Sequence, residues 1–526
     1  MLYTSTRNNK IRVTAAQAIA QGISEEGGLF VPVELPHFSM DTVREMMEMS
    51  YIDRAKTVLR TFLTDFSDEE LNYCVEGAYR ADKFSSPAVA PTVNIGGKEN
   101  ILELWHGPTC AFKDMALQLL PYLMTVSAKK TAEGKTIVIL VATSGDTGKA
   151  ALEGFKDVDK TKILVFYPVD GVSPMQKLQM TTQEGENVAV CAIHGNFDDA
   201  QSAVKSIFTN DEIKAELAKK NMMFSSANSI NWGRLVPQIV YYFSAYADLC
   251  KMGQLQVGEP MNVVVPTGNF GNILAGYYAK HMGLPIQTMV CASNTNNVLT
   301  DFLKTGTYDR NRDFYATTSP SMDILISSNL ERLLYHMSGE SDAAMRGWMT
   351  QLAENGKYTV EPEVMAKIQN EFAAGYCDEA AVADTIHKTY TDQNYLCDTH
   401  TAVAAQIAAQ CRKLIPVQVV KILDEETSIQ REFAMIKVMA VDRTTRDEII
   451  QMANIFRANI IDVSRETLTV AIFGDKSKTG ALINLLSDFG ILEMAKTGTL
   501  AIERGRSSIY DDSKLREEYN YGKNVL

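Results

Sequence analysis

From about residue 100 onward, the sequence alternates between short aliphatic runs and longer amphipathic stretches. The runs are rich in β-branched residues and read TIVILVAT, KILVFYP, ENVAVCAI, MNVVVP and IQTMVCAS. The stretches between them include DDAQSAVKSIF and RLVPQIVYYFSAYADL, in which apolar residues recur every three or four positions, as on one face of a helix. Buried strands that alternate with helices form parallel sheets covered by helices, so this pattern predicts an α/β architecture.

The two ends of the chain follow other patterns. Residues 1–85 have helical spacing, as in FSDEELNYCVEGAYR, where Ser67 is a candidate helix start. Near the other end, REFAMIKVMAV, IIDVS, TLTVAIFG and ILEMAKTGTLAIERG predict strands, and RDEIIQMANIFRAN and KTGALINLLSDFG predict helices. Their order, β-α-β-β-α-β, is the ferredoxin-like plan. Because 526 residues exceed one core, we predict a helical N-terminal subdomain (1–85), an α/β region (86–404) and a ferredoxin-like domain (405–526).

The composition excludes several classes of function. A formal charge of -13 disfavours a nucleic-acid partner, since phosphate backbones are bound mainly by an excess of Lys and Arg. No apolar run reaches about 18 residues and the N-terminus lacks a basic start followed by an apolar core, so we expect a cytoplasmic protein without a membrane partner. The eight cysteines form no CxxC pair, Cys110 is given no catalytic role, and no cluster of ligand spacing predicts a metal.

Three loops that follow strands in the α/β region are candidate catalytic or binding sites, because ligands of α/β sheets bind beyond the carboxyl ends of the strands. The first, GPTCAFKDMALQLLPYLM, places Lys113 near the start of a helix. The positive end of the helix dipole opposes an ammonium there, and a desolvated lysine beside positive potential has the lowered pKa that Schiff-base formation needs. The alternative is a solvated surface lysine.

The second and third loops are suited to anions. In VATSGDTGKAAL, two hydroxyls and the amides freed by glycines suit a carboxylate, although a packing turn remains the alternative. The motif is not a nucleotide P-loop, because it has two residues between its glycines and Ala150 after the lysine. In VVVPTGNFGNILAGYY, glycines and helix-start amides suit a phosphate monoester.

Together with YTSTRN, GGLFVP and DTHTAV, these loops resemble the long form of threonine synthase, a family of fold type II enzymes that use pyridoxal 5'-phosphate (PLP). The resemblance implies that Lys113 of AFKD carries PLP. It implies that the cofactor phosphate is held by Gly268, Asn269, Phe270, Gly271 and Asn272. The loop that would face the substrate carboxylate and the cofactor ring contains Thr143, Ser144, Gly145, Asp146 and Thr147.

The implied reaction converts O-phospho-L-homoserine and water to L-threonine and phosphate, with Lys113 as the proton shuttle. The segment SSANSINWGRLVPQ offers a site for the leaving phosphate through Ser226, Asn228, Asn231 and Arg234. We rank Arg234 first, because a guanidinium matches phosphate oxygens in pairs. We expect His106, for which no carboxylate partner is identifiable, to make a polar or core contact, and His400 to be structural. Threonine or serine dehydratase is a weaker alternative, since it has no use for the phosphate-friendly segment.

After His400 the family pattern should continue with a strand and a Thr-Ala-Ser/His-Pro-x-Lys-Phe segment, whose threonine contacts the pyridine nitrogen of PLP. Residues 405–507 instead resemble the C-terminal domain of the regulatory small subunit of acetolactate synthase, as in QIAAQCRKLIPVQVVKILDEETSIQREFAMIKV. Two interpretations stay open. The chain is an active threonine synthase with a grafted domain for self-association or amino-acid sensing, or it is a catalytically impaired chimera that assembles with the acetolactate synthase large subunit.

Overall fold

The structure is a computed structural model, and it describes residues 1–131, 134–143, 145–169, 172–195, 197–412 and 427–506. The chain divides into two compact units, Met1–Lys413 and Leu414–Leu526. Residues 1–85 belong to the same unit as the α/β region, because their buried side chains join one continuous core with it. None of the described helices is long and apolar enough to cross a bilayer.

The N-terminal segment combines helices with a small sheet that the sequence patterns did not predict. The strands β1 (Tyr3–Ser5), β2 (Asn8–Val13) and β3 (Phe30–Pro32) form an antiparallel sheet in the order β2-β1-β3. The helices are α1 (Ala15–Gln21), α2 (Met40–Met46), α3 (Tyr51–Phe62) and α4 (Asp68–Ala78). Ser67 caps α4, as predicted, and Glu70 completes a capping box by binding back to the Ser67 amide.

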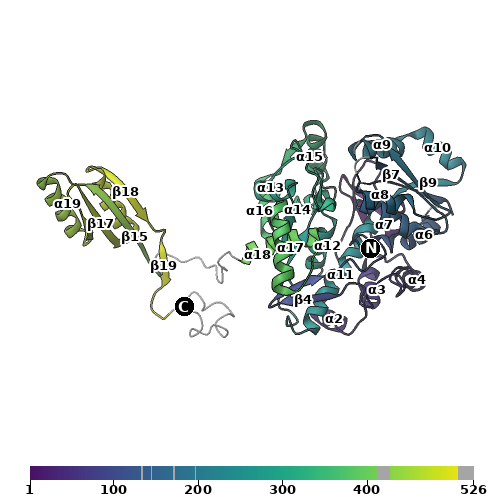
Figure 1. Cartoon of the computed structure of the whole chain (residues 1–526), viewed down its shortest axis with the longest axis horizontal. Coiled ribbons are helices and arrows are strands. Elements are labelled where there is room, and N and C mark those ends of the chain that lie inside the picture. The colour runs from purple at the N-terminus through teal and green to yellow at the C-terminus, as the bar shows by residue number, and fades with distance from the viewer. Residues whose placement is uncertain (132–133, 144, 170–171, 196, 413–426, 507–526) are drawn as a thin grey trace. The chain divides into compact units, whose positions relative to one another are not determined.

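The first parallel sheet has the order β8-β7-β6-β9. Its strands are β6 (Thr136–Ala142), β7 (Thr161–Pro168), β8 (Val188–Ile193) and β9 (Met222–Ser226). Three of the predicted runs form β6, β7 and β8, whereas β9 was not predicted. The associated helices are α5 (Asp114–Leu117), α6 (Leu120–Thr131), α7 (Asp146–Phe155), α8 (Pro174–Thr181), α9 (Phe197–Thr209) and α10 (Asp211–Lys219). Figure 1 shows the last five of these around strands β7 and β9.

The second parallel sheet has the order β10-β11-β14, with strands β10 (Met261–Pro266), β11 (Ile286–Ser293) and β14 (Phe372–Tyr376). Its helices are α11 (Trp232–Lys251), α12 (Gly271–His281), α13 (Val298–Thr305), α14 (Leu330–Met337), α15 (Asp342–Asn355), α16 (Pro362–Glu371), α17 (Glu379–Gln393) and α18 (Thr399–Arg412). Two short pairs, β4 (Thr92–Gly96) with β5 (Glu99–Leu102) and β12 (Thr307–Asp309) with β13 (Lys357–Thr359), and the 3-10 turn η1 (Pro320–Met322) complete the unit. The α/β prediction is confirmed.

Two features of this unit position the site. Helix α11 is buried almost throughout, because it is apolar on all sides and lies in the core. Within the described ranges, β10 pairs with β11 on one side and has no strand on the other, so its outer edge stays open. Val263 and Val264 of β10 line the same cavity as Ala404 and Ala405 of α18.

The C-terminal unit confirms the predicted β-α-β-β-α-β order. It contains β15 (Ser428–Met439), α19 (Arg443–Ile455), β16 (Asn459–Val463), β17 (Thr467–Gly474), α20 (Lys476–Ser487), β18 (Ile491–Lys496) and β19 (Leu500–Glu503). The predicted last strand is therefore two strands. The sheet order is β16-β17-β15-β18, and alternate residues such as Ile436 and Val470 pack in a core with the helices. Met435, Met439 and Phe473, in the opposite alternation, are exposed.

Candidate active site

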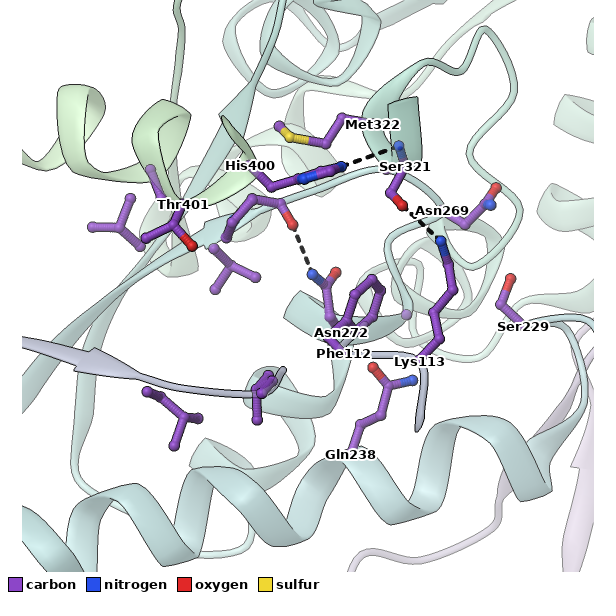
Figure 2. Close-up of a pocket in the computed structure, with 18 of the residues that line it drawn as sticks. Phe112, Lys113, Ser229, Gln238, Asn269, Asn272, Ser321, Met322, His400 and Thr401 are labelled. Atoms are coloured by element: carbon purple, nitrogen blue, oxygen red, sulfur yellow. Dashed lines mark hydrogen bonds between the residues drawn. The ribbon is translucent and has the colours of Figure 1, made fainter. Parts of the chain in front are cut away.

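One cavity of about 2240 Å³ is lined by residues from both parallel sheets of the first unit. The loops after β6 and β10 reach it, together with the start of α5, the turn η1 and the start of α18. Figure 2 shows Lys113, Ser321, His400 and Asn272 around this space. The volume exceeds the roughly 300–1000 Å³ of common ligand pockets, and the open edge of β10 accounts for part of the lining.

Lys113 lies at the N-cap position of α5, and its side chain is 12% exposed. Its Nζ donates to Ser321 Oγ at 2.7 Å and lies 3.4 Å from Asp146 Oδ2. Burial lowers the pKa of the ammonium, Asp146 opposes that shift, and Arg234 adds to it. The alternative of a solvated surface lysine is therefore wrong, because the side chain is mostly buried.

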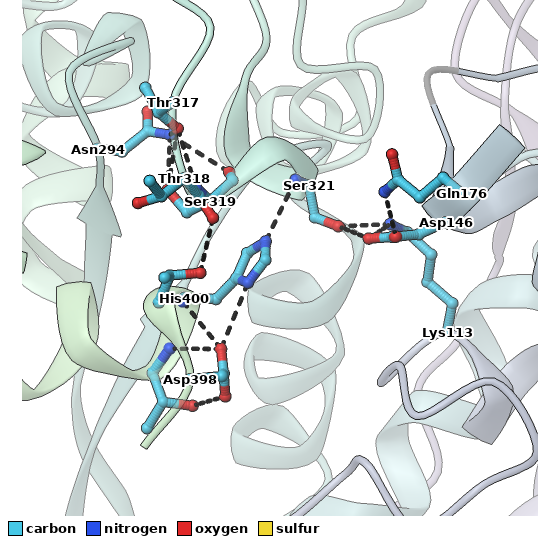
Figure 3. Close-up of polar contacts among 12 residues, drawn as sticks. Lys113, Asp146, Gln176, Asn294, Thr317, Thr318, Ser319, Ser321, Asp398 and His400 are labelled. Atoms are coloured by element: carbon cyan, nitrogen blue, oxygen red, sulfur yellow. Dashed lines mark hydrogen bonds and ion pairs between the residues drawn. The ribbon is translucent and has the colours of Figure 1, made fainter. Parts of the chain in front are cut away.

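Asp146 is the first residue of α7 and accepts side-chain hydrogen bonds from Lys113, Gln176 and Ser321. Gln176 Nε2 donates to Oδ1 at 2.7 Å, and Ser321 Oγ donates to Oδ2 at 2.5 Å (Figure 3). The neighbouring Lys113 ammonium holds the pKa of this carboxyl well below its usual range, although burial opposes the shift. The carboxylate therefore stays charged and orients the groups around the lysine.

The rest of the loop after β6 has a structural function as well. Gly145 has φ +146°, a backbone conformation that favours glycine, and it caps α7. Thr143 Oγ1 accepts hydrogen bonds from the amides of Gly145 and Gly148, both at 2.9 Å, so this hydroxyl shapes the turn. Thr143 and Thr147 line the cavity, and Ser144 lies outside the described residues.

The loop from 268 to 272 joins β10 to α12 and forms a narrow cradle. Phe270 is buried with φ +63°, and Gly268, Asn269, Gly271 and Asn272 line the cavity. A Cβ on Gly268 would lie closer than 3.0 Å to the carbonyl oxygen of Ser321. The first amides of a helix have no carbonyl partner within it, so the start of α12 can bind an anion. A phosphate group, such as that of PLP, fits this cradle.

A buried cation lies in the same cavity. Arg234 is 3% exposed and donates from Nη1 to the carbonyl of Ala227 at 2.5 Å, while its Nε has no partner among the residues described. Burial lowers the pKa of the guanidinium to about 10, and Asp114 partly offsets this. Asn228 Oδ1 is likewise buried without a partner in the described chain. An arginine with a free, buried N–H suits an anionic ligand.

The other two residues of this segment contribute to its local structure. Asn231 caps α11, because its Oδ1 accepts from the Gly233 amide and its Nδ2 donates to the carbonyls of Ile19 and Ser226. Ser226 Oγ accepts from the Asn228 amide at 3.1 Å. Among the candidates for a phosphate site, Arg234 is therefore the one with a buried donor that has no partner in the described chain, whereas the unpartnered atom of Asn228 is an acceptor.

The sequence patterns missed Ser321, Gln176 and Asp398. Ser321 N donates to His400 Nε2 at 3.2 Å, and His400 Nδ1 lies 3.3 Å from Asp398 Oδ1. Although burial raises the pKa of Asp398, hydrogen bonds from His400 and Thr401 hold it below its usual range. The only sequence signal for these contacts is DTHTAV. His400 is thus held in the wall of the cavity.

His106 has the carboxylate partner that the sequence did not identify. Its Nε2 lies 2.9 Å from Glu103 Oε2, and its Nδ1 lies 2.8 Å from Ser85 Oγ. Glu103 also accepts from the Tyr395 hydroxyl at 2.8 Å. These contacts join the segment after α17 to the segment before Lys113. The described residues contain no group of three or more His, Cys, Asp and Glu side chains that could hold a metal ion.

Three family models match the chain. They are described as "Threonine synthase N terminus" at residues 2–79, "Pyridoxal-phosphate dependent enzyme" at 95–375 and "Small subunit of acetolactate synthase" at 431–505. A similar protein, threonine synthase-like 1 of Homo sapiens, is 41% identical over 76% of this chain and 55% of its own length. This chain thus spans about half the length of the threonine synthase-like relatives it matches.

Shorter relatives are covered more fully. The threonine synthase of Pseudomonas aeruginosa is 38% identical, over 80% of this chain and 87% of that protein. The solved structure of PLP-bound threonine synthase from Brucella melitensis has a TM-score of 0.73 and 40% identity, over 79% of this chain and 86% of its own. The yeast threonine synthase structure has a TM-score of 0.71 and 35% identity, over 78% and 83%.

Proposed function

Because this chain belongs to the threonine synthase family of PLP-dependent enzymes, we propose that it converts O-phospho-L-homoserine and water to L-threonine and phosphate. The observation that supports this proposal is the meeting of three groups in one cavity. They are a buried lysine, a glycine-bounded cradle of helix-start amides and a buried arginine with a free N–H. In such a site the cradle would bind the cofactor phosphate and the arginine would bind the substrate phosphate, with the lysine amine in the same cavity.

PLP is the cofactor of this family, and the residues present fit it. Lys113 and the loop from 268 to 272 would hold it, with its phosphate at the start of α12. When bound, the cofactor supplies an electron sink that makes the protons on the substrate carbons removable. Burial lowers the pKa of Lys113, so at a given pH a larger fraction of its amine is neutral and able to accept a proton than in a solvated lysine.

The chain's own residues bind the substrate and orient Lys113. Arg234 binds the substrate phosphate through its Nε–H, which lacks a partner among the described residues, and this contact orients the leaving group. Thr147 lines the cavity at the start of α7, where its hydroxyl and the first amides of the helix would bind the substrate carboxylate. Asp146 orients Lys113 through Ser321 and keeps the proton-accepting amine in place.

The test begins with the purified full chain and PLP. Incubation with phosphohomoserine should release inorganic phosphate and threonine in equal amounts, and Lys113→Ala should release neither. Arg234→Ala should raise KM for phosphohomoserine at least tenfold while threonine binding is little changed. A visibly coloured protein that releases no phosphate would contradict the proposal, and one that makes 2-oxobutanoate from threonine would favour a dehydratase.

The open edge of β10 favours a second candidate, a protein that binds PLP but turns over slowly. The described residues place no strand beside that edge, and the family's Thr-Ala-Ser/His-Pro-x-Lys-Phe segment is absent from the sequence. The remaining role would then lie in the C-terminal unit, through self-association or assembly with an acetolactate synthase large subunit. Visible absorbance with a turnover far below that of other threonine synthases would support this candidate. A cytoplasmic location stays a prediction.

The exposed sheet face of the C-terminal unit supports a role in association. Met435, Met439 and Phe473 are solvent-exposed large apolar side chains on the face opposite the helices. If this face binds another chain, Phe473→Glu in the full-length protein should lower the apparent mass in sedimentation without changing PLP absorbance. An unchanged mass, with or without the acetolactate synthase large subunit, would contradict a role for this face.

A further inference from the structure

Ser321 lies between the two charged groups of the site. Its Oγ is 2.7 Å from Lys113 Nζ and 2.5 Å from Asp146 Oδ2, whereas the lysine and the carboxylate are 3.4 Å apart (Figure 3). An ammonium only donates and a carboxylate only accepts, so the hydroxyl accepts from Lys113 and gives its single proton to Asp146. The hydroxyl therefore takes part of the hydrogen bonding between the two groups, whose direct ion pair is longer, at 3.4 Å, than the roughly 2.7–2.9 Å of a charge-assisted hydrogen bond.

The position of Ser321 is set by contacts on two sides. Its amide donates to His400 Nε2, which must therefore carry no proton, so that the other ring nitrogen bears the proton and faces Asp398. Asp398 is itself held by the amides of His400 and Thr401 at 2.8 and 3.1 Å. On the other side, the Ser321 carbonyl packs against Gly268 of the cradle. A chain of contacts thus runs from the first turn of α18 to the reactive amine.

We propose that Ser321 is a positioning residue that acts through Lys113, holding the ion pair between the amine and Asp146 at 3.4 Å so that the amine can react with the cofactor aldehyde. This proposal rests on the proposed function. In that step the Lys113 nitrogen forms a C=N bond to the aldehyde carbon, and the aldehyde oxygen leaves as water with two protons from the amine. The step needs the neutral amine, and a shorter charge-assisted bond to the carboxylate would favour the ammonium more strongly.

The experiment measures PLP capture by the apo full-length protein as a function of pH. The growth of visible absorbance gives the rate, and borohydride trapping followed by peptide mass spectrometry identifies Lys113 as the site. In Ser321→Ala the lysine can close on Asp146, so the midpoint pH for capture should rise by about one unit, which is about tenfold slower capture at a fixed pH below the midpoint. Ser321→Thr keeps a hydroxyl and should restore the wild-type midpoint.

Two further variants separate this role from a merely structural one. Ser319→Ala removes a hydroxyl from the same loop that contacts Asn294 and Thr317 but not Lys113, so it should leave the midpoint unchanged. In Ser321→Ala combined with Asp146→Asn the carboxylate is gone, so the midpoint should fall back to the wild-type value or below. These shifts are read from the midpoint and not from the amount of PLP bound, which misfolding would also lower.

The outcomes distinguish the two proposals. A wild-type midpoint in Ser321→Ala, with Lys113 still trapped, would overturn the role of Ser321 and leave the proposed function untouched. An upward shift that Asp146→Asn fails to reverse would also overturn it, because the carboxylate would not be the cause. If the wild-type chain captures no PLP at any pH, the proposed function fails first and this inference fails with it.

Discussion

Gly268 is the residue whose replacement tests the geometry of the cradle most directly. An ideal Cβ built on its backbone would lie closer than 3.0 Å to the carbonyl oxygen of Ser321, a separation that real Cβ atoms essentially never show. The obstacle is backbone, so no flexible side chain can move aside. Gly268→Ala must therefore push the loop after β10 away from η1, the turn that holds Lys113 through Ser321.

The size of the effect follows from the cost of overpacking. Inserting a methyl group into a well-packed site typically costs about 1–3 kcal/mol. If the loop relieves this strain by opening in the apo protein and must close again on PLP, the dissociation constant for PLP rises by about 5- to 160-fold. The assay is titration of the apo protein with PLP at visible wavelengths, combined with urea unfolding without PLP.

A matched control is available in α15. A Cβ on Gly347 would meet nothing within 4 Å, and alanine is the better helix former by about 1 kcal/mol. Gly347→Ala should therefore leave PLP binding unchanged and raise stability slightly. If Gly268→Ala bound PLP within about twofold of wild type and unfolded at the same urea concentration, the close approach of the two loops would not matter and the reasoning would be refuted.

Three further results should follow from local features. Burial raises the pKa of Asp114 to about 6, so ionisation of this carboxyl lowers the stability of the fold as pH rises from about 4 to 6. In urea unfolding, the free energy of unfolding of Asp114→Asn relative to wild type should therefore be about 3 kcal/mol higher at pH 7 than at pH 4. Burial lowers the pKa of His336 to about 4, so stability falls as pH drops from 6.5 to 4, and His336→Gln should show a shallower acid limb in thermal unfolding. Ser67→Ala removes the cap of α4 and should lower the free energy of unfolding in urea by about 0.5–2 kcal/mol. An unchanged free energy of unfolding would show that the capping box does not stabilise the fold.

Much of the fold was predictable from local patterns. The runs that form β6, β7, β8, β10 and β11 are aliphatic because both faces of a covered parallel sheet are buried. The ferredoxin-like order near the C-terminus follows from periodicity in the same way. Strands β1 and β3 were missed because each has only three residues, which is too short for a periodic signal.

In the candidate site too, local sequence patterns indicated some residues and missed others. The sequence by itself predicted Lys113 and the loop from 268 to 272, because a lysine at a helix start and glycines after a strand leave local signals and the resemblance to threonine synthases gives them roles. Only the tertiary structure brought Ser321 to Lys113 across 208 positions and used Asn231 as a helix cap. It also left the Arg234 Nε without a partner in the part of the chain that is described. Hydrogen-bond partners of buried polar groups are decided by which distant segments pack together, and spacing along the chain does not encode that.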